Sequence, residues 1–398
     1  MKNNLKKYME DNNLTQEQVA NEIGVHKSTI KRILGTLNGH VSLFTQVKIA
    51  NFLDDKEMKT SYTLDDLNTK HYSDRKNILL FNLLNNFESS IDIIEPFAGN
   101  GSLISSLDRF SSLECYDILP QNKDIVKRDT LINPPSYNKK YVVTNPPYLA
   151  RNKAMDKTIF DKYNVDDLYK AFIKSIIEGN CEGGAIIIPL NFLTDENSKD
   201  IRELFFSRYR VENLNIFKCQ MFDYTKYNTC SFNFFKDENG TNTVDTLIFQ
   251  KRDIVLHLEI NLRKKYNYRL FGEFYAGIQK RNISIDRFTN KNQSPSNISI
   301  KCIDGITEQS KIKAEYINNP TIGKQSDRTS AVIVMDKVLT KEQELEVVNL
   351  FNTFITTQRE KYYNLIFTNF RENNRKRIGF DLAYNILAMC IEEVVNND

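Results

Sequence analysis

The chain has 398 residues, of which 40% are hydrophobic and 26% charged, so it can form two or three domains that each bury a core. Its net charge of +3 is too small to favour one class of partner. No apolar run approaches the ~20 residues that cross a bilayer, and residues 1–4 lack the apolar stretch of a secretory signal, which predicts a cytoplasmic location. The six cysteines are scattered without a CxxC pair, so we expect neither a disulfide framework nor a bound metal.

Residues 1–55 show the apolar spacing of a small helical unit. Thr15 and Gln18 are spaced as a capping box, in which each side chain satisfies an open backbone N–H of the next helix, and Gly24 is placed to end that helix. A short helix follows, and a last one is expected near residues 43–53. The short helix turns its apolar residues inward and presents an outward row of polar and basic side chains: Lys27, Ser28, Thr29, Lys31 and Arg32.

This pattern resembles the helix-turn-helix of phage-repressor-type regulators over most of the first 55 residues. In that motif the second helix of the pair lies in the major groove of DNA, and the first helix braces it against the backbone. The resemblance therefore implies that the outward row contacts double-stranded DNA. A plain helical bundle with a solvated basic face is the alternative.

Three further segments differ in composition and periodicity. The polar residues 56–70 are typical of a linker. Residues 71–250 alternate between strand and helix patterns, which predicts an α/β domain with a mostly parallel sheet. Residues 251–398 open with basic and aromatic side chains in alternation and end in helical sequence over 341–395, which predicts an α+β region. Basic residues among aromatics are typical of nucleic-acid contact, whereas a solvated surface around an aromatic core is the alternative.

The first strand of the α/β domain, Ile91–Ile94, leads into the loop Glu95–Gly101. Ligands of parallel sheets lie outside the carboxyl ends of strands, where glycine lets the backbone approach closely. The loop lacks the third glycine of dinucleotide sites, and the acid that ends the strand would repel phosphate and suits a cationic ligand. The next strand ends in Asp117, 117 − 99 = 18 residues after Gly99, where a carboxylate can accept both hydroxyls of a ribose. We expect Asp129 just before the third strand, where it can accept from an adenine amine.

The fourth strand, Tyr141–Thr144, runs into Asn145-Pro146-Pro147-Tyr148. Two consecutive prolines cannot continue a sheet, so this segment leaves it as a stiff turn. An Asn side-chain oxygen and a backbone carbonyl can accept both hydrogens of an exocyclic amine, which fixes a weak nucleophile and supports the positive charge that develops on its nitrogen. Asn145 and the carbonyl of Pro146 are the expected acceptors, and Tyr148 offers a flat face to a base taken out of the stack.

In this order and spacing the two loops resemble class I methyltransferases, and the tetrapeptide resembles the catalytic motif of N6-adenine DNA methyltransferases whose cofactor loop precedes the catalytic loop. The resemblance spans about residues 71–250. It implies that S-adenosyl-L-methionine is the cofactor, held by Tyr72, Glu95, Pro96, Phe97, Ala98, Gly99, Gly101, Asp117, Ile118, Asp129 and Asn145. It also implies that Tyr148 and Phe222 hold the substrate base, with Tyr224 and Tyr227 as rivals of Phe222, and that the strand and loop Gly183–Leu193 wall its pocket. Met221 and Phe222, followed by Asn228–Phe232, resemble the next strand pair of these enzymes.

A second Asn-Pro-Pro sequence precedes the catalytic one. Asn133-Pro134-Pro135-Ser136 lacks the aromatic residue, and no apolar strand leads into it. We therefore expect a plain loop there.

The tetrapeptide alone does not choose the substrate, because it or close variants also occur in protein glutamine methyltransferases and RNA adenine methyltransferases. The helix-turn-helix and the basic, aromatic start of residues 251–398 favour DNA, with the latter as a target-recognition region. We therefore expect a site-specific DNA methyltransferase acting on the N6 amine of adenine, in a restriction-modification or phage system. A cognate restriction endonuclease is a candidate partner whose existence the sequence leaves open. Cytosine N4 is an alternative target. The helix-turn-helix also allows a second role as a transcription regulator.

Overall fold

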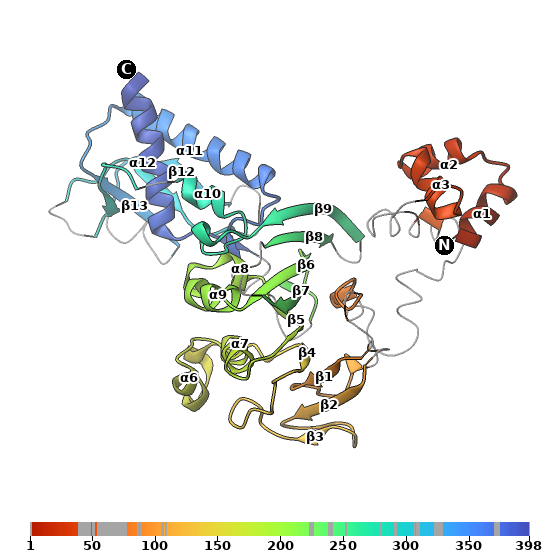
Figure 1. The fold of residues 1–398 in the computed structure, drawn as a ribbon. Coiled ribbons are helices and arrows are strands. Elements are labelled where there is room, and N and C mark those ends of the chain that lie inside the picture. Colours follow the sequence, from red (N-terminus) through yellow and green to blue (C-terminus); the bar gives the residue numbers. More distant parts are fainter. Residues whose placement is uncertain are drawn as a thin grey trace. The chain divides into compact units, whose positions relative to one another are not determined.

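The computed structural model describes residues 2–38, 49, 52–53, 78–85, 87, 90–104, 107, 110–222, 227–237, 242–250, 253–278, 280–289, 293–305, 307, 311–321, 329–369 and 375–397 (Figure 1). Several predictions from the sequence lie outside these residues. They concern the linker 56–70, the cofactor residue Tyr72, the rival aromatic Tyr224 and most of the helix expected near residues 43–53.

The helical unit at the N-terminus consists of three helices in the described part of residues 2–38: α1 (Lys2–Asp11), α2 (Gln16–Ile23) and α3 (Lys27–Leu34). The predicted capping box of Thr15 and Gln18 is confirmed, and Gly24 ends α2 in the left-handed conformation with φ +70°. Apolar residues from all three helices form one core, in which Leu5, Val19 and Ile30 are fully buried. Local capping signals therefore set the ends of α2, while Ile49 and Leu53 from farther along the chain join the same core.

The middle of the chain is built on one large sheet. Within the described residues it has nine strands in the order β3-β2-β1-β4-β5-β7-β6-β8-β9. Their bounds are β1 (Asp92–Glu95), β2 (Ser112–Asp117), β3 (Val126–Lys127), β4 (Tyr141–Thr144), β5 (Gly183–Pro189), β6 (Tyr209–Phe217), β7 (Thr229–Lys236), β8 (Thr243–Gln250) and β9 (Asp253–Asn261). Strands β1 to β5 pair in parallel, β7 is antiparallel to β6, and β6 is parallel to β8.

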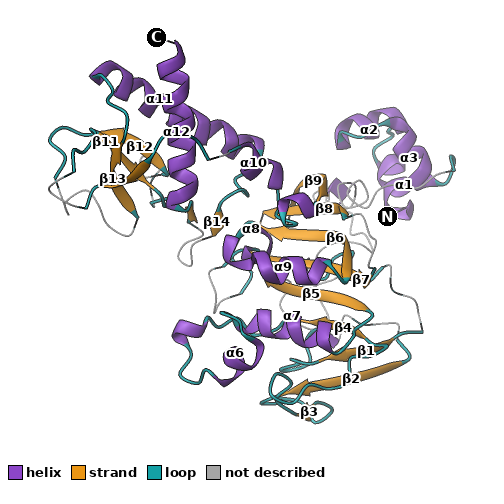
Figure 2. Cartoon of the chain, turned by 60° about the vertical axis from the view of Figure 1, so that its left-hand side comes forward, coloured by secondary structure: helices purple, strands orange, loops and turns teal. Residues whose placement is uncertain are grey.

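This mostly parallel sheet confirms the class I methyltransferase fold that the sequence predicts. The strand order reverses between β1 and β4, so the loops after these two strands open at the same crevice. Helices α6 (Thr158–Tyr163) and α7 (Leu168–Glu178) connect β4 to β5, and α7 lies beside these two strands (Figure 2). The ring of Phe172 on α7 packs edge-on against Phe97 in the loop after β1, with ring centroids 5.3 Å apart.

Buried polar side chains of the sheet hold the segment that precedes β1. The amide of Asn215 on β6 donates to the carbonyl of Phe81 at 2.8 Å, and the amide of Asn233 on β7 donates to the carbonyl of Leu83 at 3.1 Å. Both asparagines are at most 1% exposed. Buried amides that bond to backbone carbonyls fix residues 78–85 on the sheet without any regular pairing.

The remaining described segments form an α+β region, as the sequence predicts. Strands β10 (Ile285–Arg287), β11 (Ile298–Lys301), β12 (Lys313–Tyr316) and β13 (Ser330–Met335) pair antiparallel in the order β10-β13-β11-β12. The long helix α11 (Lys341–Lys361) packs against β12 and α12 (Phe380–Asn397). The smaller elements are α8 (Asn191–Thr194), α9 (Lys199–Phe206), α10 (Gly272–Gly277), β14 (Thr368–Asn369) and β15 (Lys376–Arg377), with 3-10 turns η2 (Arg151–Lys153), η3 (Glu196–Ser198) and η4 (Lys264–Tyr266).

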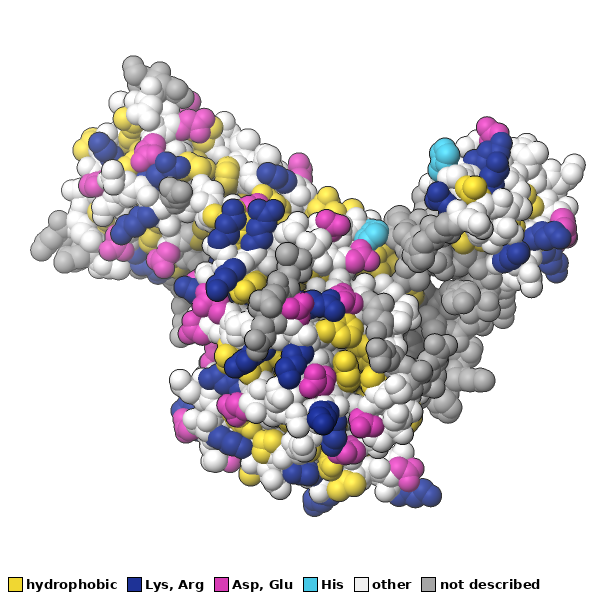
Figure 3. Space-filling model, viewed as in Figure 1, with side chains coloured by type: hydrophobic (Ala, Val, Ile, Leu, Met, Phe, Trp, Pro, Cys, Tyr) yellow, Lys and Arg dark blue, Asp and Glu magenta, His cyan; other side chains and the backbone are white. Residues whose placement is uncertain are grey.

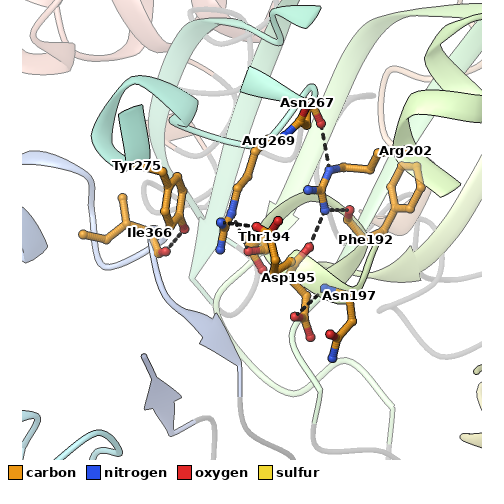
Figure 4. A network of polar contacts seen from close by, with 10 residues as sticks. Phe192, Thr194, Asp195, Asn197, Arg202, Asn267, Arg269, Tyr275 and Ile366 are labelled. Carbon is orange, nitrogen blue, oxygen red and sulfur yellow. Dashed lines mark hydrogen bonds and ion pairs between the residues drawn. The ribbon is translucent and has the colours of Figure 1, made fainter. Parts of the chain in front are cut away.

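Packing divides the chain into two compact units that do not follow a single cut near residue 250. The first consists of Met1–Ile188, Ser207–Cys219 and Thr229–Glu259, and the second of Pro189–Phe206, Gln220–Asn228 and Ile260–Asp398. The segments that leave β5 and β6 thus pack with the C-terminal α+β region. The core of the second unit includes a network in which Arg202 and Arg269 bind backbone carbonyls (Figure 4).

Three further observations concern the described residues only. None of their helices is both long and apolar enough to cross a membrane. No group of three or more His, Cys, Asp or Glu side chains among them is arranged to hold a metal ion. The six cysteines all lie in described segments, and none of them forms a disulfide.

Candidate active site

The loop after β1 is shaped by two glycines with positive φ. Gly99 has φ +55° and Gly101 φ +82°, a region that side chains disfavour. A Cβ placed on Gly99 would meet no described atom within 4 Å, so the space beside it is open. The loop is tied to β2, because the N–H of Ala98 donates to the carbonyl of Tyr116 at 2.8 Å and that of Gly99 to Oδ2 of Asp117 at 2.7 Å.

The two predicted carboxylates take different positions beside this loop. Glu95 ends β1 and is buried, with 1% of its surface exposed. Burial, and secondly the charge of Glu95, raises the pKa of the Cys115 thiol to about 12. Asp117 ends β2 and is half-buried, and its Oδ1 also accepts the N–H of Leu119 at 2.8 Å. Each oxygen of a carboxylate has two lone pairs, so Asp117 keeps acceptor capacity for a ligand.

An apolar rim surrounds the ends of β2 and β3. Its side chains are more than half exposed, which is unusual for such residues: Ile118, Leu119, Val126 and Ile132. Ile118 is among the predicted cofactor residues.

Asp129 does not lie where the sequence predicts. It follows β3 instead of preceding a third strand, so this prediction was wrong. The reason is a tight turn, in which Oδ1 of Asp129 accepts the N–H groups of Leu131 and Ile132, both at 3.0 Å. Such a turn ends the strand. A contact of Asp129 with the cofactor stays a prediction.

The tetrapeptide Asn145–Tyr148 follows β4 and is bonded to β5 through its tyrosine. Pro146 is buried, while Asn145 and Tyr148 are half-buried. The hydroxyl of Tyr148 lies 2.5 Å from Oδ1 of Asn145 and 2.7 Å from the carbonyl oxygen of Ile187 on β5. Its ring meets Tyr169 of α7 at 88°, with centroids 6.4 Å apart. The side chain expected to hold the base is therefore fixed by contacts on two elements.

The exit of the tetrapeptide is held by Asp167, which the sequence analysis missed. Oδ1 of Asp167 accepts the N–H of Leu149 at 3.1 Å, and the N–H of Leu168 donates to the carbonyl of Leu149 at 3.1 Å. Burial raises the pKa of Asp167 to about 6, although hydrogen bonds from the backbone of Tyr169 and Leu149 oppose this shift. In the sequence, an acid just before an apolar helix indicates only a helix cap. Its contact with Leu149 cannot be predicted there, because the two residues are 18 positions apart.

We expect Asp167→Asn to stabilise the first compact unit, in which Asp167 lies, at pH 8. The folded-state pKa is above the ordinary value of 3.8, so the ionised carboxylate costs stability above about pH 6, and this cost disappears as the pH falls towards 4. An asparagine oxygen still accepts one backbone N–H. Thermal unfolding should show a gain of about 1–3 kcal/mol at pH 8, roughly half of that gain at pH 5 and little difference at pH 4. A gain that is equal at all three pH values would contradict the assignment.

The earlier Asn-Pro-Pro sequence forms a loop, as predicted. Asn133 is exposed, and its carbonyl accepts from Nε of Arg128 at 2.8 Å. The same guanidinium donates to the carbonyl of Pro134 at 2.9 Å. These bonds give the segment a structural role on the rim of the sheet.

Among the predicted DNA contacts, Lys27 is engaged inside the helical unit. Its ammonium lies 2.7 Å from Oε2 of Glu17 on α2, so it bridges the two helices of the pair. Lys31 and Arg32 are exposed on α3, and Lys31 lies about one helical turn after Lys27. Figure 3 shows several basic side chains on the face of this unit that it presents.

Phe222 lies in the second unit and is 5% exposed. The prediction placed Met221 and Phe222 in the first strand of a pair. In the structure both residues lie between β6 and β7, so this part of the prediction was wrong. The amide of Gln220 donates to the carbonyl of Phe222 at 2.8 Å and closes a turn there. Its role towards a base stays a prediction, as does that of Tyr227, which is half-buried.

Two segments of the chain match known protein families. Residues 42–222 match the family described as Eco57I restriction-modification methylase, and residues 5–54 match a helix-turn-helix family. Along its sequence the chain is therefore similar first to a helix-turn-helix family and then to a restriction-modification methylase family. Both matches agree with the resemblances that the sequence motifs indicate. None of the curated proteins matches the chain.

Several of the solved structures similar to the chain belong to restriction-modification systems. The methyltransferase subunit of a type I system from Streptococcus thermophilus is 14% identical with a TM-score of 0.34, over 56% of this chain and 55% of that one. The type I restriction enzyme EcoKI M protein is 14% identical with a TM-score of 0.34, over 96% and 80%. The type IIG restriction endonuclease BpuSI is 13% identical with a TM-score of 0.36, over 71% and 40%. The chain thus spans little more than half of the Streptococcus protein and less than half of BpuSI.

Proposed function

We propose that the methylase domain transfers a methyl group from S-adenosyl-L-methionine to the N6 amine of an adenine in DNA. The observation that carries this proposal is the position of Asn145 and Pro146 after β4, in the same crevice as the glycine loop after β1. Direct transfer requires that the groups which hold the amine lie beside the loop that holds the cofactor, here at one switch point of the sheet. The match to a restriction-modification methylase supports DNA as the polymer.

The residues around the glycine loop fit this cofactor. The buried carboxylate of Glu95 suits the cationic methionine part of the cofactor. The open space beside Gly99 lets cofactor atoms come close to the backbone of the loop. Asp117 can accept the ribose hydroxyls while it holds Gly99. The exposed apolar rim, which includes Ile118, suits the adenine ring. When bound, the cofactor supplies an electrophilic methyl group.

We expect Asp117→Asn to weaken cofactor binding about 10- to 100-fold. One oxygen becomes an NH2 group that would face the N–H of Gly99 or of Leu119, so both the loop and the ribose lose an acceptor. Titration calorimetry with S-adenosyl-L-methionine measures the change. The exposed Asp124 in the following turn gives a matched control, and Asp124→Asn should bind as the wild type does. Equal affinity of both variants would remove Asp117 from the cofactor site.

In the proposed reaction Asn145 and the carbonyl of Pro146 accept the two hydrogens of the adenine amine. These two hydrogen bonds localise the lone pair on the amine nitrogen. They also stabilise the positive charge that forms on it as the new N–C bond is made. The bound cofactor would supply the methyl directly to nitrogen, its S–CH3 bond breaking as the N–C bond forms and the electron pair staying on sulfur as a neutral thioether. The amine would then release a proton to solvent. Tyr148 supports the flipped base with its ring. The stiffness of two prolines keeps these acceptors in place.

The proposal is tested by expression in a host without DNA methylation, followed by single-molecule sequencing of the genomic DNA. Methyl groups on N6 of adenine at one sequence motif are expected. Modified cytosine N4 would correct the base, and unmodified DNA with modified ribosomal or transfer RNA would correct the polymer. An Asn145→Ala strain grown in parallel shows that any mark depends on this site.

A second function as a transcription regulator is favoured by the exposed basic side of α3. Replacing Lys31 and Arg32 together with alanine removes two charges from this side and leaves the Lys27–Glu17 bridge intact. If methylation persists at the same motif while binding to the protein's own promoter is lost, the helical unit is regulatory. If the methylated motif changes, the unit belongs to target recognition.

A further inference from the structure

The hydroxyl of Tyr148 lies between two acceptors. Its oxygen is 2.5 Å from Oδ1 of Asn145 and 2.7 Å from the carbonyl oxygen of Ile187. Both separations fall within the range of an O–H···O hydrogen bond. A phenol has one proton, so Tyr148 can donate to only one of these oxygens at a time.

The shorter distance also tells which end of the Asn145 amide faces the hydroxyl. An N–H···O bond is about 2.7–3.2 Å long, whereas O–H···O bonds extend down to about 2.5 Å. The separation of 2.5 Å therefore fits the amide oxygen and not the NH2 group. This orientation matters because an amide turned by 180° would present a donor where the substrate amine needs an acceptor.

We propose that the Tyr148 hydroxyl is a positioning group for the Asn145 amide, apart from any stacking by its ring. Before the substrate binds, it donates to Oδ1 and holds the amide oxygen in one orientation. When the amine donates to Oδ1, the hydroxyl turns to the carbonyl of Ile187, which is already within reach. No buried O–H is left without an acceptor, so this exchange costs little. The inference rests on the proposed amine methylation.

The test compares Tyr148→Phe in two backgrounds. With Asn145 present, Tyr148→Phe removes the donor that faces the amide oxygen, so the turnover number should fall about tenfold. KM for DNA and cofactor should stay within twofold, because the ring remains. With Asn145→Asp the carboxylate presents an oxygen either way round. There Tyr148→Phe should change the turnover number less than twofold.

Tyr209→Phe is the matched control. The hydroxyl of Tyr209 donates to the carbonyl of Cys181 at 3.1 Å, away from the catalytic loop, and its removal should leave the turnover number within twofold. A turnover number of Tyr148→Phe close to that of the wild type would overturn the inference. An equal loss in both backgrounds would also overturn it, because the hydroxyl would then act on packing and not on the amide.

A second measurement does not need activity. In protein labelled with [15N]asparagine, the side-chain signals of Asn145 are assigned by their absence in Asn145→Asp. They should shift in Tyr148→Phe and stay unchanged in Tyr209→Phe; unchanged signals in both would sink the inference. Absence of methylation by the wild type, together with a shifted signal, would instead refute the proposed reaction and leave the hydrogen bond in place.

Discussion

Asn145→Ala is expected to lower the single-turnover rate of DNA methylation about 100- to 1,000-fold, the usual cost of removing one preorganised group that stabilises developing charge. The variant keeps the carbonyl of Pro146, so only one of the two amine acceptors is lost. Cofactor affinity should fall far less than this rate, because Asn145 is only one of the residues assigned to the cofactor and the glycine loop and Asp117 are untouched. Rapid-quench measurements with a labelled methyl group give the rate, and calorimetry gives the affinity.

The chain offers a matched control in Asn133, the asparagine of the other Asn-Pro-Pro sequence. Asn133 is exposed, and Arg128 Nε binds it through its backbone carbonyl, which alanine retains. Asn133→Ala should therefore methylate at a rate within about twofold of the wild type. Near-normal turnover of Asn145→Ala would refute the mechanism, and a large loss in Asn133→Ala would show that the wrong loop has been assigned.

Local signals predicted those parts of the structure that depend on a few neighbouring residues. The capping box of Thr15 with Gln18 and the left-handed Gly24 set the ends of α2 as expected. The strands before Glu95 and Asn145 were found from short apolar runs followed by glycine or proline. Such signals act through hydrogen bonds and backbone conformations within one turn, so they are visible in the sequence.

Features that join distant segments could not be predicted in this way. Asn215 and Asn233 stand in strands where a polar residue suggests an exposed face, yet they are buried and bind residues 134 and 150 positions away. The strand β9 extends the large sheet beyond the boundary placed at residue 250, since pairing and not composition decides membership of a sheet. Asp167 joins the site only because β4 and α7 meet there.

Arg202 shows the same limit inside a helix, and it gives the largest expected effect on stability. It lies on the buried side of α9 between Ile201 and Phe205, where helical spacing calls for an apolar residue. The side chain has no exposed surface. Its guanidinium donates to the carbonyls of Asn267 at 3.0 Å, Phe192 at 2.9 Å and Asp195 at 2.5 Å, as Figure 4 shows. A planar group with five donors can join three backbone segments, which no apolar side chain can do.

Arg202→Met should therefore destabilise the second unit by about 3 kcal/mol, although methionine fills much of the same volume. The substitution removes the cost of burying a charge, but it leaves carbonyls that are no longer bonded, and the latter effect is the larger. Calorimetric unfolding should show the transition of this unit about 6–12 °C lower. Arg208→Met, on the exposed surface just after α9, should shift stability by no more than about 0.5 kcal/mol. If Arg202→Met unfolds like the wild type, the buried guanidinium is dispensable and apolar packing alone holds α8 and η3 in place.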